Sequence, residues 1–573
     1  MGKRNAHWLL AVLVMLPTLL PADGSFLQPF KRMLILENGR QKPLDTFARN
    51  LLKQFSGRST LSGQEASAWL ARVLFTPGRT LNDEIFLVNH PDVSAALDLP
   101  GQGRQRYSFL QIRPRLAGLQ RLAMQAAQMD DKSRSAVENE FMRLYVNTQV
   151  YGILLNAFHF ASGPGSGSRE PAAAGAPLLA IIPLTASRGE EWLSPGRILA
   201  TSGLDRTAVA AEIALLSGAA RAFAAGLDQE FSRAVSAFNL SIQKRLGHGG
   251  ADKKIILEIQ YNRLEPFFKA QLAYGLALVF LLLSLLIRGN HLTRLGRLLL
   301  LAGLLAHSSG LLARMVIMNR PPVTNLYETF VFVAWTCVLL GIVLEFQQKN
   351  SLGVMAGSVA GLLFLLIAGR YSLEGDTMGM LAAVLDSNLW LTTHVVTISM
   401  GYAGCIIAGI IGHVYLIHQL LYPGIRHFRQ RAARSIYAVL AFGLVFTVIG
   451  TVMGGIWADQ SWGRFWGWDP KENGALLIIL WCAILFHARL AGMIGDLGMA
   501  AGSIVSIVTV VLAWFGVNLL GVGMHSYGFT SGLAFWLLVF TGGELVFITI
   551  ALLLANKNAA PGSAARRHRS AMK

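Results

Sequence analysis

Nine apolar runs follow one another between residues 270 and 554, and they limit the possible folds more than any other feature of the sequence. Most are close to the roughly 20 residues that a helix needs to cross the hydrocarbon core of a bilayer. Of the 573 residues, 53% are hydrophobic and only 14% are charged. The sequence therefore predicts an all-α polytopic membrane protein with about nine transmembrane helices, at Ala270–Ile287, Leu298–Ile317, Tyr327–Phe346, Val354–Ala368, His394–Leu420, Ile436–Ile456, Gly474–His487, Ala500–Leu520 and Gly532–Leu554.

The basic residues between these runs predict the orientation. The formal net charge is +18, which in a soluble chain would suggest a nucleic-acid partner. Here most of the basic charge of the loops lies in alternate connections, as the positive-inside rule requires of cytoplasmic loops. We therefore expect no nucleic-acid partner, and a cytoplasmic location for Arg288–Arg297, Gln347–Asn350, Arg426–Arg434, Arg489 and the basic tail 557–573.

The first half of the chain has a different composition. Residues 1–22 carry Lys3 and Arg4 before a short apolar run, which predicts a signal peptide or a signal anchor. Residues 23–268 show amphipathic patterns, such as a helix starting near Asp45 within Pro43–Gly57. We therefore expect a mainly helical extracytoplasmic domain before the membrane domain 269–556. It has no catalytic constellation, so its expected role is to dock a partner or substrate.

The stretch Trp457–Leu476 lies between two apolar runs and holds four of the twelve tryptophans. Its aromatic rings offer flat apolar faces, and Asp469-Pro470 followed by Glu472 is typical of a helix start. The pattern predicts a loop that forms a platform for a large planar ligand, although an aromatic belt at the membrane interface would use the same residues. The platform residues are Trp462, Phe465, Trp466, Trp468 and Asp469.

Two histidines are expected on the same side of the membrane as this stretch. His394 opens one apolar run, and His525 lies just beyond the end of another. Two neutral imidazoles facing a planar aromatic platform are the arrangement that an axially ligated haem iron needs. The sequence therefore predicts that His394 and His525 bind the iron of a haem held against the platform.

Four stretches, in order, carry a resemblance to a known family. The stretch W-G-x-F-W-x-W-D-P-K-E from Trp462 to Glu472 resembles the tryptophan-rich WWD signature of haem-handling proteins in cytochrome c maturation. Its D-P-K-E form is most similar to the CcsA (ResC) proteins of the system II pathway. Three further stretches agree: Pro321–Trp335, Leu389–Ala403 and Asn518–Gly528. The resemblance covers the second half of the chain, from about Lys269, and says little about the first half.

The resemblance implies a function in cytochrome c biogenesis at the bacterial inner membrane, with the N-terminal domain and the WWD loop on the periplasmic side. The protein would bind haem b as a substrate and present it for attachment to the C-x-x-C-H motif of an apocytochrome c, as part of a haem lyase. A separate CcsB (ResB)-like membrane protein is the implied partner. Cys337, Cys405 and Cys482 form no C-x-x-C pair, so a thiol-reducing protein is also expected.

Some alternatives stay open. The resemblance links His487, at the end of the helix after the WWD loop, to haem held within the membrane, and we expect it to bind haem there; an interfacial histidine beside Arg489 is the alternative. His307 lies in the middle of a predicted span. Its role there is that of a ligand, of a member of a polar network or of a hydrogen-bonded core residue. The related system I proteins CcmC and CcmF share the WWD loop, so haem handling of the system I type is an alternative function. A haem exporter or haem-binding subunit that performs no ligation is the alternative of a different class.

Overall fold

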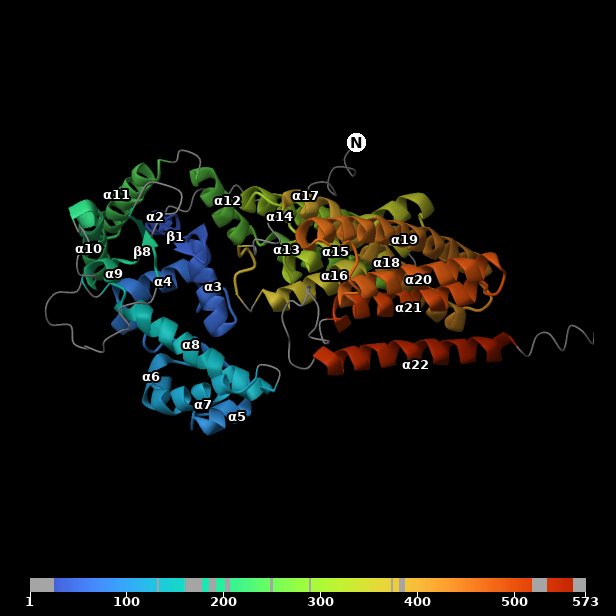
Figure 1. Cartoon of the computed structure of the whole chain (residues 1–573), viewed down its shortest axis with the longest axis horizontal. Helices are drawn as coiled ribbons and strands as arrows, with labels where there is room; N and C mark the ends of the chain where they lie inside the picture. The colour runs from blue at the N-terminus through green and yellow to red at the C-terminus, as the bar shows by residue number, and fades with distance from the viewer. Residues whose placement is uncertain are drawn as a thin grey trace, which may run out of the picture.

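The computed structural model describes residues 25–101, 103–130, 133–158, 160, 178–184, 192–200, 207–247, 251–287, 290–372, 375–380, 387–517 and 533–559. It shows a smaller N-terminal domain beside a bundle of long helices (Figure 1). The predicted signal segment 1–22 and residues 560–573 of the predicted basic tail lie outside the described residues.

The N-terminal domain is mainly helical, and its described strands form four antiparallel pairs. In the β1–β2 hairpin, Glu37 pairs with Arg40 around Asn38 and Gly39, which both have positive φ, as a tight hairpin turn requires. The elements are α2 (Gln28–Lys31), β1 (Leu34–Glu37), β2 (Arg40–Pro43), α3 (Leu44–Ser56), β3 (Thr60–Leu61), β4 (Gln64–Glu65), α4 (Ala66–Phe75), η1 (Pro77–Arg79), β5 (Phe86–Val88), α5 (Pro91–Ala96), β6 (Gln105–Tyr107), α6 (Phe109–Ile112), η2 (Arg113–Arg115), α7 (Leu116–Gln128), α8 (Ala136–Asn156), β7 (Ile182–Pro183), β8 (Trp192–Leu193), α9 (Pro195–Ala200), η4 (Thr207–Val209), α10 (Ala210–Ala225), α11 (Asp228–Leu246) and α12 (Ala251–Leu264).

Helix α3 confirms the helix predicted near Asp45. It ends at Gly57, whose φ of 68° is the left-handed conformation that commonly terminates helices. Its apolar face, with Phe47, Leu51 and Phe55, is buried in a core of its own that extends from Leu27 to Ile255. The N-terminal domain therefore has its own hydrophobic core.

The second half of the chain forms the helix bundle. Its core extends from Phe267 to Ala551, separate from the first. Within the described residues, ten helices are long and apolar enough to cross a membrane. Nine correspond to the predicted spans, while the tenth, Thr207–Ala225, packs Leu216 and Ala219 into the N-terminal core. The all-α polytopic fold is thus confirmed, with α13 (Pro266–Leu286), α14 (Asn290–Met318), α15 (Leu326–Gln348), α16 (Leu352–Tyr371), α17 (Asn388–Trp390), η6 (Leu391–Val395), α18 (Val396–Leu421), α19 (Arg426–Trp462), α20 (Pro470–Leu490), α21 (Asp496–Trp514) and α22 (Leu533–Ala559).

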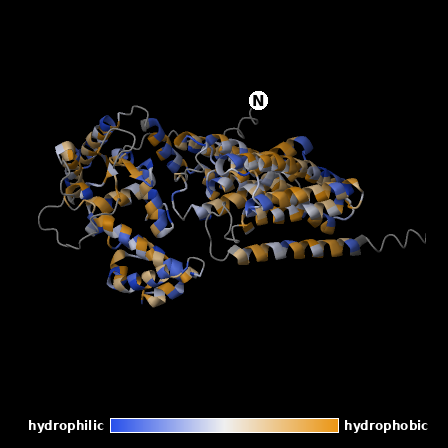
Figure 2. Ribbon diagram, viewed as in Figure 1, coloured by the Kyte–Doolittle hydropathy of each residue, from blue (hydrophilic) through white to orange (hydrophobic). Residues whose placement is uncertain are grey.

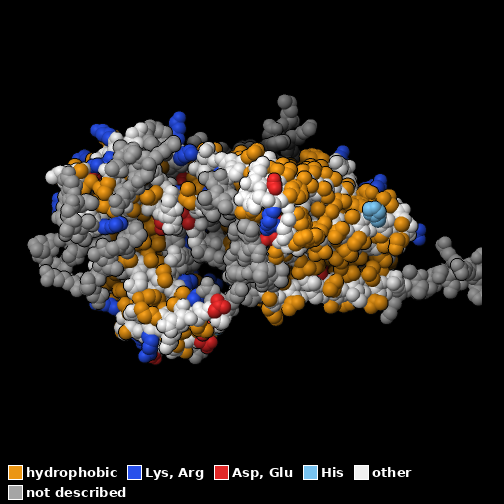
Figure 3. Space-filling model, viewed as in Figure 1, with side chains coloured by type: hydrophobic (Ala, Val, Ile, Leu, Met, Phe, Trp, Pro, Cys, Tyr) orange, Lys and Arg blue, Asp and Glu red, His pale blue; other side chains and the backbone are white. Residues whose placement is uncertain are grey.

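The bundle exposes apolar side chains along its sides. Hydrophobic residues dominate its long helices, whereas the N-terminal domain mixes hydrophobic and hydrophilic residues (Figure 2). In the space-filling view, apolar side chains cover the side of the bundle (Figure 3). Leu286 and Leu538, for example, are 81% and 74% exposed. A soluble protein would bury such side chains, so this surface is the one that faces lipid.

Successive helices of the bundle alternate in direction. Because α13 enters the bundle from the N-terminal domain, the junctions α14–α15, α16–α17 and α19–α20 lie at the end of the bundle nearest that domain. The tryptophan-rich stretch and the start of α18 are therefore at the same end as the N-terminal domain.

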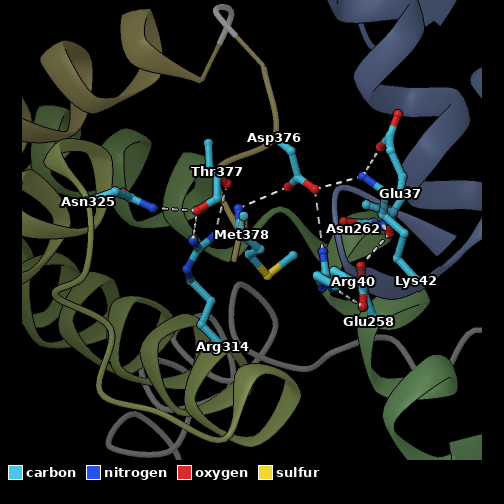
Figure 4. Close-up of polar contacts among 12 residues, drawn as sticks. Glu37, Arg40, Lys42, Glu258, Asn262, Arg314, Asn325, Asp376, Thr377 and Met378 are labelled. Carbon is cyan, nitrogen blue, oxygen red and sulfur yellow. Dashed lines mark hydrogen bonds and ion pairs between the residues drawn. The ribbon is translucent and has the colours of Figure 1, made fainter. Parts of the chain in front are cut away.

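Charged residues link the two parts where the β1–β2 hairpin meets the connection between α16 and α17 (Figure 4). Nζ of Lys42 lies 2.7 Å from Oδ2 of Asp376, and Nη1 of Arg40 lies 3.6 Å from the same oxygen. Arg40 also pairs with Glu258 of α12, and Lys42 with Glu37. The side chains of Lys42 and Arg40 are only 1% and 7% exposed, so these charges depend on each other rather than on water.

The next residue, Thr377, continues this link into the bundle. Its carbonyl accepts hydrogen bonds from Nη2 of Arg314 at 2.6 Å and from Nδ2 of Asn325 at 2.9 Å. Arg314 in turn pairs with Glu328 at 2.6 Å, and both side chains are almost completely buried. Buried polar groups from the domain and from the bundle therefore hold the same short connection (Figure 4).

We expect Asp376→Asn to lower the free energy of unfolding by about 1–3 kcal/mol, because the buried Lys42 and Arg40 lose a carboxylate partner. Burial alone would raise the pKa of Asp376, but Lys42 and Arg40 outweigh it and the pKa lies below its ordinary value. The stabilisation is therefore complete above the ordinary pKa, near 4, and is lost as the pH falls through the lower pKa of the folded state.

Thermal unfolding of the detergent-purified protein at descending pH measures this effect. The melting temperatures of wild type and Asp376→Asn should converge in acid, while the exposed control Asp130→Asn should match wild type throughout. A difference between wild type and Asp376→Asn that stays constant down to the lowest pH would contradict the role of this carboxylate.

Candidate functional site

The tryptophan-rich stretch is a shorter loop than the sequence predicts. Helix α19 continues through Trp457 to Trp462, and α20 already begins at Pro470. Only residues 463–469 are irregular, so the predicted loop Trp457–Leu476 includes the end of one helix and the start of the next. The platform therefore rests on two rigid helix ends.

Hydrogen bonds to Glu472 fix the shape of this short loop. The carboxylate accepts from the backbone N–H of Gly467 at 2.9 Å and of Asp469 at 3.0 Å. Asp469 caps α20 by accepting from the N–H of Lys471 at 3.0 Å, and Pro470 occupies the first turn. The predicted helix start is confirmed. Asp469 is only 4% exposed, so it shapes the platform from beneath rather than offering a surface to a ligand.

The aromatic side chains of the loop differ in exposure. Trp468 is 70% exposed and Phe465 is 47% exposed, whereas Trp462 and Trp466 are half-buried. The rings of Trp466 and Trp468 meet at 90° with centroids 5.9 Å apart. The guanidinium of Arg464 lies 5.9 Å from the ring of Trp462. The loop thus presents large apolar faces beside one cation, as a planar ligand with acidic edges would need.

His394 lies in a π-helical turn at the start of the long α17–α18 segment. Such turns are rare and are often found at functional sites. Nδ1 of His394 lies 2.8 Å from the carbonyl oxygen of Gly450, to which it can donate a hydrogen bond. The ring also meets Trp457 edge-on at 5.8 Å, and Trp457 stacks on Trp390. Histidines that bind metals commonly donate their other N–H to a carbonyl in this way, which makes Nε2 the nitrogen that would bind iron.

Two adjacent glycines of α19 bring His394 and the loop together. A Cβ at Gly454 would lie 2.6 Å from the His394 ring, and a Cβ at Gly455 would lie 2.7 Å from the ring of Phe465. Larger residues would therefore push either ring away. The imidazole and the aromatic loop consequently meet on the same turn of one helix, as a haem site with an aromatic platform requires.

The structure places the other predicted site residues differently. His525 lies outside the described residues. His487 is exposed near the far end of α20, 17 residues from Pro470 and thus about 25 Å along the helix from the loop. Its Nδ1 lies 2.8 Å from the carbonyl oxygen of Ala483. It cannot reach the same ligand atom as His394, so any haem at His487 occupies a second position.

His307 lies in the core of the bundle. It is completely buried in α14, its Nδ1 lies 3.1 Å from the hydroxyl of Tyr274, and its ring meets Phe267 edge-on at 5.3 Å. Nε2 of His307 is buried and has no hydrogen-bond partner among the described residues, so the three interpretations that the sequence leaves open stay open.

Sequence reasoning missed several residues of this site. Trp390 donates from Nε1 to Oε1 of Gln460 at 3.0 Å and stacks on Trp457, so it extends the aromatic surface. The pair Gly454 and Gly455 was also missed, although two adjacent glycines in an apolar run are a recognisable signal of close helix contact.

We expect Asp469→Ala to destabilise the start of α20 by about 1 kcal/mol, because the helix loses its side-chain cap. Asp469→Asn should cost much less, since asparagine is an equally good cap. The loss of stability is measured by the melting temperature and by the fluorescence of the exposed Trp468 in the two purified variants. Equal effects of the two substitutions would mean that the carboxylate has a role other than capping.

The chain is similar to a known family and to several known proteins. The cytochrome C assembly protein family matches residues 323–525, which include His394, the whole loop and His525. The cytochrome c biogenesis protein CcsA of Synechococcus sp. (strain CC9605) is 30% identical over 238 residues, which cover 36% of this chain and 78% of that protein. The chain belongs to the CcsA family of cytochrome c biogenesis proteins. The family resemblance predicted from the four motifs is thus confirmed.

Two further relatives of this CcsA-family protein extend the comparison. Protein NrfI of Wolinella succinogenes is 26% identical over 507 residues, which cover 85% of this chain and 53% of that protein. A match of this length must include much of residues 23–268, which the motifs did not reach. CcsA of Chlamydomonas reinhardtii is 35% identical over 220 residues, 36% of this chain and 61% of that protein. The chain thus spans about half of NrfI and somewhat more of this CcsA.

Proposed function

We propose that this CcsA-family protein binds haem b as a substrate at the domain-facing end of the bundle and presents it for covalent attachment to the C-x-x-C-H motif of an apocytochrome c. His394 and His525 bind the iron, and Trp462, Phe465, Trp466 and Trp468 form the platform, which Asp469 supports. The observation that carries the proposal is the meeting of His394 and Phe465 on Gly454 and Gly455 of α19.

The donor set suits this ligand. The contact of Nδ1 with the Gly450 carbonyl fixes the tautomer and the orientation of the His394 ring, which is what an iron ligand needs. The exposed ring of Trp468 and the half-exposed ring of Phe465 can cover a porphyrin face. Nη1 of Arg464 lies 3.4 Å from Oε1 of Glu472, and its remaining donors can pair with a propionate. The residues present therefore fit haem.

The proposed contribution of the protein to the reaction is positioning. In thioether formation a thiol adds across a haem vinyl group: a carbon–sulfur bond forms, the proton ends on the neighbouring carbon, and nothing is oxidised or reduced overall. The nucleophilic thiols belong to the apocytochrome. Holding the haem edge at a fixed place makes the reaction of the thiols with the vinyl groups effectively unimolecular, which accelerates it.

Orientation and partners follow from the same proposal. The N-terminal domain and the aromatic loop lie on the periplasmic side of the bacterial inner membrane, where basic loops are depleted. A CcsB-like membrane protein completes the complex, and a thiol-reducing protein keeps the apocytochrome thiols reduced. The buried Cys337, Cys405 and Cys482 are unsuited to that reduction because they are inaccessible.

The test is the accumulation of covalent cytochrome c in cells that lack their own maturation system and carry this chain with its partner. The proposal predicts haem-stained cytochrome c on a denaturing gel. Haem that leaves the cell without becoming attached would instead identify an exporter, the alternative of a different class. Attachment that proceeds without this chain would contradict any role in ligation.

A further inference from the structure

We propose that the junction between the N-terminal domain and the bundle binds the headgroup of an anionic phospholipid, with its acyl chains running down α13. The site is a cavity of about 310 Å³ between α3, α12 and the ends of α13, α15 and α16. This volume lies at the lower end of the range of small-molecule sites. It adjoins the charged link between the β1–β2 hairpin and Asp376, and Asn262, Asp376 and Thr377 line it (Figure 4).

One wall of the cavity carries donors without acceptors. Asn50 and Lys53 lie one turn apart on α3 and both line the cavity. Nδ2 of Asn50 is buried and has no hydrogen-bond partner among the described residues. No carboxylate lies within ion-pair distance of the Lys53 ammonium in the part of the chain that the structure describes. These two donors are therefore available to an anion.

The other charges at the cavity are already paired. Arg49 contacts Asp45 at 3.1 Å and, more loosely, Glu265 at 3.8 Å. Asp376 is neutralised by Lys42 and Arg40. Burial lowers the pKa of Lys53, Glu265 opposes that shift, and Arg49 adds to it. Burial thus disfavours the charged form of Lys53, and a bound anion would stabilise that form, since it would give the buried ammonium a counter-charge.

The cavity also has an apolar lining, which continues along the lipid-facing side of the bundle. Phe267, Val331 and Leu365 belong to this lining. At its edge Phe268 is 59% exposed, and it begins a stripe on α13 with Leu272 and Leu276, which are 55% and 40% exposed. These residues are four apart and so share one helix face. A ligand with an acidic head and hydrocarbon chains matches both the polar and the apolar parts of the lining.

The occupant is therefore a phospholipid with a net negative headgroup, and its phosphate accepts from Lys53 and Asn50. Because Lys53 belongs to the N-terminal domain and the stripe belongs to the bundle, the lipid would join the two parts beside the Asp376 link. This inference does not depend on haem binding.

The test titrates the full-length protein in detergent with phosphatidylglycerol or with phosphatidylcholine of the same acyl chains, and native mass spectrometry counts the lipids retained. We expect phosphatidylglycerol to bind more tightly than phosphatidylcholine. Lys53→Gln should weaken phosphatidylglycerol binding about tenfold, which corresponds to about 1.4 kcal/mol, and Lys53→Arg should restore it. The control Arg121→Gln, an exposed cation of the same domain, should have no effect.

If Lys53→Gln lowers the melting temperature, Asn50→Asp provides a second variant, since it keeps the size of the side chain and should repel the headgroup. Equal retention of the two lipids, or phosphatidylglycerol binding unchanged in both variants, would overturn the proposal. Displacement of the lipid by inorganic phosphate would identify a simple anion site and overturn the role of the acyl chains. If haemin bound in a manner that depends on Lys53 while phosphatidylglycerol did not bind, the lipid assignment would be overturned and the ligand would be another acidic amphiphile.

Discussion

Replacing His394 by alanine is expected to reduce the yield of covalent cytochrome c at least about tenfold and to remove haem from the purified protein. The substitution deletes both the nitrogen that would bind iron and the contact of Nδ1 with the Gly450 carbonyl. Loss of the groups that merely orient a metal ligand costs about 10–100-fold in metal affinity, so loss of the ligand itself should cost at least as much. Haem per protein in the purified variant and haem-stained cytochrome c in the cells are the two readouts.

His427→Ala is the matched control, because His427 is exposed near the opposite end of α19. It should keep full haem content and full yield. If His394→Ala retained as much haem as His427→Ala, iron ligation by His394 would be excluded.

Trp468→Phe and Trp468→Ala test how much the aromatic platform contributes to haem retention. The alanine variant should retain less haem than the phenylalanine variant, because it removes the most exposed ring of the loop.

Arg314→Met is expected to be the most destabilising single substitution in the link between domain and bundle. It leaves the Glu328 carboxylate, 2% exposed, without its cation and removes the two donors to Thr377. Breaking a buried ion pair from one side costs about 3–5 kcal/mol. The fraction of protein that remains monodisperse after heating in detergent should fall at a much lower temperature than for wild type.

The double variant Arg314→Met, Glu328→Gln should recover part of this loss, because it removes the uncompensated charge. Arg489→Met is the matched control: its pair with Asp496 is more than one-third exposed on the arginine side, and such pairs contribute about 1 kcal/mol or less. If Arg314→Met melted like Arg489→Met, the buried pair would not hold the connection as proposed.

Local features of this protein were predictable from sequence. Apolar runs of spanning length identified the helices of the bundle, and the order Asp469, Pro470, Glu472 identified the start of α20, because each of these signals lies within one segment. The shared motifs identified the family, since they keep their order along the chain.

Contacts between distant segments were not predictable. Lys42 and Asp376 are 334 residues apart, and nothing near either residue specifies the other. The same is true of His394 and Gly450, whose contact depends on how η6 packs against α19. Helix α19 also extends further than its apolar run, because Trp457 and Trp462 fit the interface end of a helix as well as a loop. His525 was predicted from its motif, and its pairing with His394 stays a prediction.

The absorption spectrum of the detergent-purified wild-type protein, oxidised and reduced, tests the central claim most directly. It should be recorded on protein co-purified with its partner from haem-replete cells. The account predicts the spectrum of low-spin haem with two imidazole ligands, lost or altered in His394→Ala and in His525→Ala. A colourless protein, or a spectrum that neither substitution changes, would contradict it and leave the tryptophan loop as an aromatic belt.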